Sequence, residues 1–244
     1  MTLLSWFAAQ LHPGAPGLWL VLDLLFALGL LLAGSWILAT RQRLLRALRL
    51  LLVPWLALLA GAISPQWMGM AGVDWQVGLT LGLGFVLVML ALLGLTHLSV
   101  REPHLPPAAR AESSLDVALA AGLEQFHWAF QRGALLILMP TWPGALEAPA
   151  YWAIWIATLL ALPGIWLHRQ GLTRLYALVA LVGTAILFFY TRNFWLCWVL
   201  HAGVMLVGGA TFARTEPGRR ASMLSQTETD TVAHARPVQN PRSL

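Results

Sequence analysis

The sequence predicts an all-α protein, a polytopic transmembrane helical bundle of about seven spans. Of its 244 residues, 59% are hydrophobic and only 10% are charged, and the mean hydropathy is +0.71. Soluble domains carry about 25% charged residues, so this composition indicates an integral membrane protein. The thirteen Trp are typical of a protein with aromatic belts at two membrane interfaces.

The expected spans are apolar runs, because a hydrocarbon core requires roughly 20 residues of helix to cross it. Six runs meet this length: 17–39, 44–63, 76–98, 149–167, 172–190 and 194–212. A seventh run, 115–139, is less apolar, with Ser113 or Ser114 as its N-cap and Pro140 at its end.

Three regions follow from this pattern. Residues 1–114 hold the N-terminal spans and a cytoplasmic loop, and residues 115–212 hold the last four spans. Residues 213–244 form a polar cytoplasmic tail, which we expect to be disordered because it cannot bury enough apolar surface.

The arginines predict the orientation of the spans. All fifteen basic residues are Arg, and most gather in alternate loops: around 41–49, 101–110, 169–174 and 214–220. The intervening segments 64–75 and 140–148 contain none. Cytoplasmic loops carry an excess of basic residues. We therefore expect the N-terminus outside and the C-terminus in the cytoplasm, and we attribute the net charge of +5 to topology rather than to nucleic-acid binding.

The run 115–139 places four polar side chains on one broad face. With about 100° per residue and Glu124 taken as zero, His127 falls near −60°, Gln131 near −20° and Arg132 near +80°. Exposing such side chains to lipid costs free energy, so this face should point into the bundle or into a water-filled cavity. The group could supply a general acid and base, or it could serve only to fasten helices together.

A second polar group lies in the run 194–212. His201 stands near its middle, Cys197 precedes it by one turn on the same face, and Asn193 marks the outer end. Cys197 is the only Cys, which excludes an intramolecular disulfide, and we expect it to be a small buried apolar residue. His201 should face the polar helix 115–139. Asp23, in the first span, is expected near the outer interface.

The chain resembles the CPBP family, the CAAX-protease and bacteriocin-processing intramembrane proteases, over roughly residues 115–210. "FQRGALL" is similar to the family's Phe-Arg-Gly-Leu-Leu run and puts Arg132 and Gly133 in register. "LFFYTRNFWLCWVLHAG" is similar to the stretch that ends at the last motif His, which aligns His201.

The chain also departs from the family pattern. His127 and Trp128 stand where the family has its Glu pair, and Glu124 comes one turn earlier. Residues 149–167 contain no His for the second motif, and Met205 stands where the family has Asn after the last His.

The resemblance implies a divergent intramembrane endopeptidase of the bacterial inner membrane, acting on a peptide or protein substrate at the bilayer. Glu124 would activate water, His127 would replace the missing His, and His201 would be the site imidazole. The supporting residues would be Arg132, Gln131, Cys197 and Asn193. Two His and one Glu are the ligand types of some catalytic zinc sites, and they equally suit a mechanism in which a glutamate activates water without a metal. We favour no tightly held metal.

Two alternatives stay open. The first is a catalytically inactive CPBP-like membrane protein that acts in partner binding or maturation. The second is a small proton-coupled transporter that relays protons through Glu124, His127 and His201. A peptidase needs these three side chains to converge around a space for water, whereas an inactive protein would leave them apart or mutually saturated.

Overall fold

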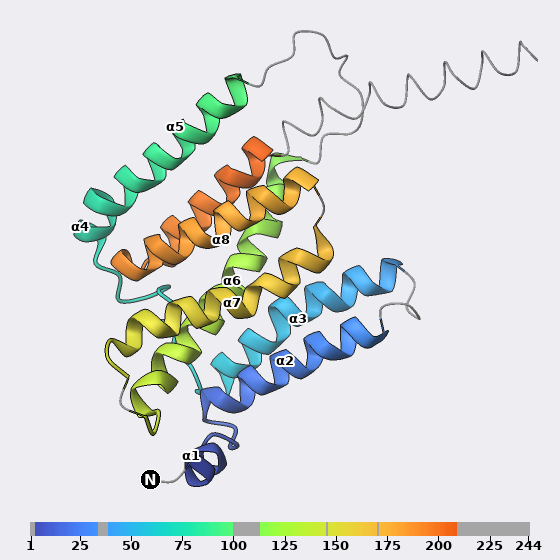
Figure 1. Cartoon of the computed structure of the whole chain (residues 1–244), viewed down its shortest axis with the longest axis vertical. Coiled ribbons are helices and arrows are strands. Elements are labelled where there is room, and N and C mark those ends of the chain that lie inside the picture. The colour runs from blue at the N-terminus through green and yellow to red at the C-terminus, as the bar shows by residue number, and fades with distance from the viewer. Residues whose placement is uncertain (1–2, 34–38, 100–112, 145, 170, 209–244) are drawn as a thin grey trace, which may run out of the picture.

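The computed structural model describes residues 3–33, 39–99, 113–144, 146–169 and 171–208, and within them the chain is all-α (Figure 1). Its elements are α1 (Leu3–Ala9), α2 (Pro16–Ala33), α3 (Ala39–Leu59), α4 (Trp75–Val77), the π-helical turn η1 (Gly78–Gly82), α5 (Leu83–Ser99), α6 (Ser114–Leu138), the 3-10 turn η2 (Met139–Thr141), α7 (Pro149–His168), α8 (Gly171–Thr191) and a further helix, Phe194–Gly208, called here the 194–208 helix.

Each of the seven predicted spans coincides with a helix, with α4, η1 and α5 together forming the third. The short helix α1 was not predicted. The predicted tail, 213–244, and the loop that holds Arg101 and Arg110 lie outside the described residues.

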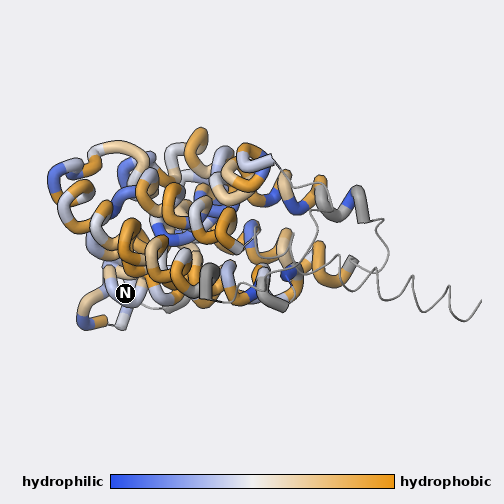
Figure 2. Tube along the Cα trace, turned by 90° about the horizontal axis from the view of Figure 1, so that it is seen from above, coloured by the Kyte–Doolittle hydropathy of each residue, from blue (hydrophilic) through white to orange (hydrophobic). Residues whose placement is uncertain are grey.

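In the part of the chain that the structure describes, three helical stretches are long and apolar enough to cross a membrane: Trp75–Leu95, Pro149–Leu167 and Thr173–Thr191. Two other apolar helices, α2 and the 194–208 helix, are shorter within their described parts. The two remaining long helices, α3 and α6, carry more charged residues and are not apolar enough to meet this criterion for a membrane span. Figure 2 shows hydrophobic stretches along the helices, interrupted by hydrophilic positions.

Local caps explain where two of the helices begin. The Ser113 hydroxyl accepts a hydrogen bond from the Asp116 amide at 3.1 Å, which confirms Ser113 as the N-cap of α6. The Asn193 Oδ1 accepts hydrogen bonds from the amides of Trp195, at 2.9 Å, and Leu196, at 3.2 Å. Asn193 therefore caps the 194–208 helix.

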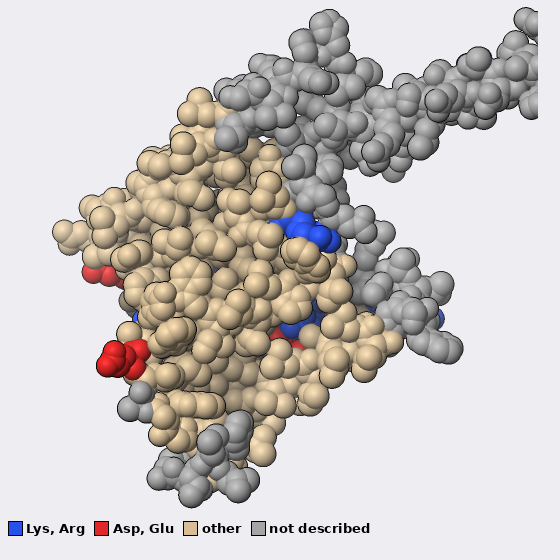
Figure 3. Space-filling view, viewed as in Figure 1, with Lys and Arg blue, Asp and Glu red and all other residues tan. Residues whose placement is uncertain are grey.

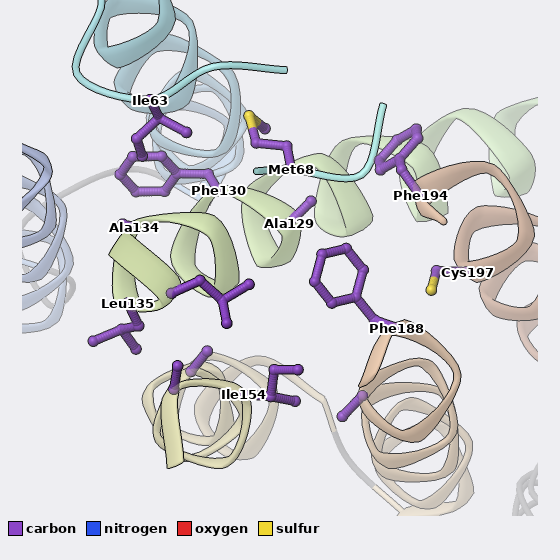
Figure 4. Close-up of a cluster of buried hydrophobic side chains, with 14 of the residues drawn as sticks. Ile63, Met68, Ala129, Phe130, Ala134, Leu135, Ile154, Phe188, Phe194 and Cys197 are labelled. Atoms are coloured by element: carbon purple, nitrogen blue, oxygen red, sulfur yellow. The ribbon is translucent and has the colours of Figure 1, made fainter. Parts of the chain in front are cut away.

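The central element is α6, which packs against α2, α3 and α7. Figure 4 shows the apolar face of α6 surrounded by side chains from other segments; the labelled residues include Ala129, Phe130, Ala134, Leu135, Ile63, Met68, Ile154 and Phe188. This buried cluster joins residues from both predicted regions, 1–114 and 115–212.

The segment around Trp67–Gly69 closes one side of this core. A Cβ added at Gly133 would lie 3.0 Å from the Trp67 carbonyl oxygen, so α6 and this segment approach backbone to backbone. Gly69 has a positive φ of 72°, and its carbonyl accepts the Phe194 amide at 2.9 Å. Glycine adopts this left-handed conformation without steric cost.

Candidate functional site

A cavity of about 230 Å³ lies between α2, α3, α6 and α7. Its polar lining comes from α3, α6 and the end of α7: Arg46, Arg49, Glu124, His127, Gln131 and Arg169. Leucines and other apolar residues of α2 and α7 form most of the rest. On the face shown in Figure 3, acidic and basic atoms lie side by side near α3 and the end of α7, partly covered by uncharged residues.

The Glu124 carboxylate is held by Arg169, which directly follows α7. The Arg169 Nη2 lies 2.7 Å from Oε1 and 2.8 Å from Oε2 of Glu124. Both side chains are largely buried, at 16% exposure for Glu124 and 18% for Arg169. The sequence placed Arg169 in a cytoplasmic loop and did not identify it as a site residue; its guanidinium neutralises the predicted catalytic acid.

His201 lies beside Glu124, as predicted, with its Nε2 3.7 Å from Oε2 of Glu124. That distance is too long for a hydrogen bond. The imidazole is fully buried and stacks on Trp128, with ring centroids 4.6 Å apart and planes 5° apart. Neither ring nitrogen has a hydrogen-bond partner among the described residues. Trp128 thus covers the imidazole.

His127 contacts Asp23, an acid that the sequence placed near the outer interface. Asp23 is fully buried, and its Oδ1 lies 2.8 Å from the His127 Nε2. Arg49 donates to both carboxylate oxygens, from Nε and Nη2, at 2.8 Å each. Gln131 donates from Nε2 at 3.1 Å. Asp23 therefore joins α2, α3 and α6.

The Asp23–Arg49 pair could have been predicted from the sequence. Consecutive helices joined by a short connection are expected to run antiparallel, so residues equally far from the connection come side by side. Asp23 and Arg49 each lie thirteen residues from position 36, midway between the end of α2 and the start of α3.

The other predicted supporting residues lie away from the cavity. Arg132 donates from Nη2 to the Thr184 hydroxyl, at 3.0 Å, and its guanidinium carbon lies 5.5 Å from the Phe188 ring centroid. Cys197 is buried, with its Sγ 3.5 Å from the Thr184 carbonyl oxygen. Arg132 thus fastens α6 to α8, Cys197 packs between helices, and Asn193 is a helix cap.

Among the described residues, no group of three or more His, Cys, Asp or Glu side chains is arranged to hold a metal ion. The predicted trio is divided between two clusters, Glu124 with His201 and His127 with Asp23.

No protein-family model, curated protein or solved structure matches this chain. The resemblance to the CPBP family therefore rests on the sequence motifs.

Proposed function

We propose that this chain is an integral membrane protein of CPBP-like fold that binds an amphiphilic guest in its cavity and does not hydrolyse it. The observation behind the proposal is that Glu124 and His127 at the cavity are already paired, and that the nearby His201 is enclosed. Arg169 holds Glu124, Asp23 holds His127, and Trp128 covers His201.

This arrangement disfavours hydrolysis for a chemical reason. A general base needs a free lone pair within reach of water, and its protonation must be favourable. Both oxygens of Glu124 accept hydrogen bonds from Arg169. Protonation of Glu124 would remove its negative charge and weaken this charge-assisted contact, so it is unfavourable. His201 has no exposed surface, so water cannot reach its ring in this arrangement.

The cavity lining favours an amphiphile as the guest. Leu28 of α2 and Leu167 of α7 both line the cavity, yet each is about half exposed, at 50% and 55%. The cavity therefore adjoins the apolar outer surface that would face lipid. A guest arriving from the bilayer would place its apolar part along these leucines and its polar part among the charged residues of α3 and α6.

The test uses the full-length protein purified in a nonionic detergent, with retained lipid measured by native mass spectrometry. Gly164 lines the cavity, and a Cβ there would meet no atom within 4 Å, so Gly164→Phe places a ring in open space. Gly84 in α5 is equally open but does not line the cavity, so Gly84→Phe is the matched control. We expect Gly164→Phe to lose bound lipid and Gly84→Phe to retain it. Equal retention by the two variants would contradict the proposal.

A second candidate is the glutamate-dependent peptidase, favoured by the 3.7 Å approach of Glu124 and His201. If Arg169 moved away from Glu124, the carboxylate would be free to activate water. The test is cleavage of fluorescent peptides with a membrane-spanning segment by purified wild-type protein, Glu124→Gln and His201→Ala. Binding without hydrolysis predicts no cleavage by any of the three. Cleavage by the wild type that both substitutions abolish would establish the peptidase instead.

A further inference from the structure

We propose that the guest is a membrane lipid with a phosphate headgroup, and that Arg46 is the residue that binds its phosphate. This inference rests on the proposed function of the cavity and names the chemical class of its guest. Three observations support it: the charge of the cavity lining, an unpaired acceptor, and the size of the cavity.

The charges around the cavity do not balance. Arg49 is paired with Asp23, and Arg169 is paired with Glu124. Arg46 is half-buried and lines the same cavity. The Glu124 carboxylate attracts it, but Arg169 already holds that carboxylate, and within the described part of the chain no ion pair closer than 4 Å involves Arg46. The three arginines of the lining face two carboxylates, Asp23 and Glu124, so these five side chains carry one positive charge in excess. A guanidinium in this position is suited to a phosphate, which it can bind through two parallel hydrogen bonds.

Gln131, which lines the same cavity, contributes an acceptor. Its Nε2 donates to Asp23, so the orientation of the amide is determined and Oε1 is left as an acceptor. That Oε1 is buried and has no hydrogen-bond partner among the described residues. A hydroxyl on the headgroup would supply the missing donor. A glycerol headgroup offers such a hydroxyl, whereas a choline headgroup offers a cation and no donor.

The volume of about 230 Å³ is too small for a whole lipid. Pockets that enclose an entire drug-sized ligand measure roughly 300–1,000 Å³. The headgroup and the first carbons would therefore lie inside, and the acyl chains would continue along the exposed leucines of α2. Basic pockets between membrane helices on the cytoplasmic side bind anionic headgroups, and Arg46 lies in the half of α3 that the arginine pattern places there.

The experiment titrates the full-length protein, in nonionic detergent, with four probes in native mass spectrometry: phosphatidylglycerol, phosphatidylcholine with the same acyl chains, palmitate and inorganic phosphate. The variant is Arg46→Gln. Arg41→Gln is the control, because Arg41 lies on the same helix and is exposed outside the cavity. Both variants remove one positive charge. Gel filtration and thermal unfolding in the same detergent verify that they are folded.

We expect the wild type to prefer phosphatidylglycerol. Arg46→Gln should weaken that binding roughly tenfold or more, and Arg41→Gln should leave it unchanged. Equal weakening by the two variants overturns the inference, as does palmitate or inorganic phosphate binding as tightly as phosphatidylglycerol. Equal binding of both phospholipids, with loss in Gly164→Phe, overturns the inference but leaves the proposed function standing. Lipid binding that Gly164→Phe does not affect overturns both.

Discussion

Among single residues, Asp23 joins three helices, although no sequence motif emphasised it. It accepts hydrogen bonds from Arg49 of α3 and from His127 and Gln131 of α6. A buried ion pair adds little net stability compared with an apolar replacement, but removal of one partner leaves an uncompensated buried charge. The network should therefore behave as a unit.

This reasoning predicts the effect of Asp23→Asn. We expect the variant to lose about 3 kcal/mol or more of unfolding free energy, because Arg49 stays largely buried without its counter-charge. The measurement is unfolding in mixtures of sodium dodecyl sulfate and a nonionic detergent. Arg49→Gln should cost a similar amount, and the double variant Asp23→Asn/Arg49→Gln should cost much less than the sum. Additive losses would show that the two residues are not coupled.

At the scale of elements, the position of α6 depends on a close backbone contact at Gly133. The nearest atoms to an added Cβ are the carbonyl oxygen and carbon of Trp67, at 3.0 and 3.2 Å. Backbone atoms cannot move aside as the end of a flexible side chain can. This glycine therefore allows α6 to pack against the segment that follows α3.

We expect Gly133→Ala to destabilise the protein by about 1–3 kcal/mol, because the added methyl group overpacks this contact. Gly84→Ala is the matched control, since a Cβ at Gly84 meets no atom within 4 Å. Alanine is the better helix former by about 1 kcal/mol, so this control should be neutral or slightly stabilising. The same detergent unfolding assay compares the two. A control that loses as much stability as Gly133→Ala would rule out the backbone contact as the cause.

At the scale of the whole molecule, the segments that the arginine pattern places outside contact one another. The Trp6 ring lies 4.9 Å from the Trp142 ring and donates to the Thr141 hydroxyl at 3.1 Å. Trp195 donates to the Met70 carbonyl at 3.3 Å. Figure 1 shows η2 and the start of the 194–208 helix toward one end of the bundle, and the end of α2 and the start of α8 toward the other.

Cysteine labelling tests the orientation. We expect a membrane-impermeant maleimide to label Gln66→Cys in intact cells and to label Ser114→Cys only after the membrane is opened, because the stretch Trp75–Leu95 between them is long and apolar enough to cross. Both positions are exposed, and the native Cys197 is buried, so the wild type serves as the unlabelled control. The reverse pattern would invert the topology, and labelling of both in intact cells would contradict a crossing between them.

Local patterns in the sequence were enough to predict the helices and several of their boundaries. Apolar runs predicted the helices, and Ser113 predicted the start of α6, because helical hydrogen bonds and caps connect residues only a few positions apart. The grouping of polar residues on α6 also predicted, correctly, that His201 would lie beside Glu124.

The pairs between charged side chains of helices far apart in the chain emerged only from the fold. His127 meets Asp23 across 104 positions, and Glu124 meets Arg169 across 45. These pairs depend on how each helix is rotated and how it crosses its neighbours. Packing of side chains from many helices at once determines that geometry, and no local pattern in the chain encodes it.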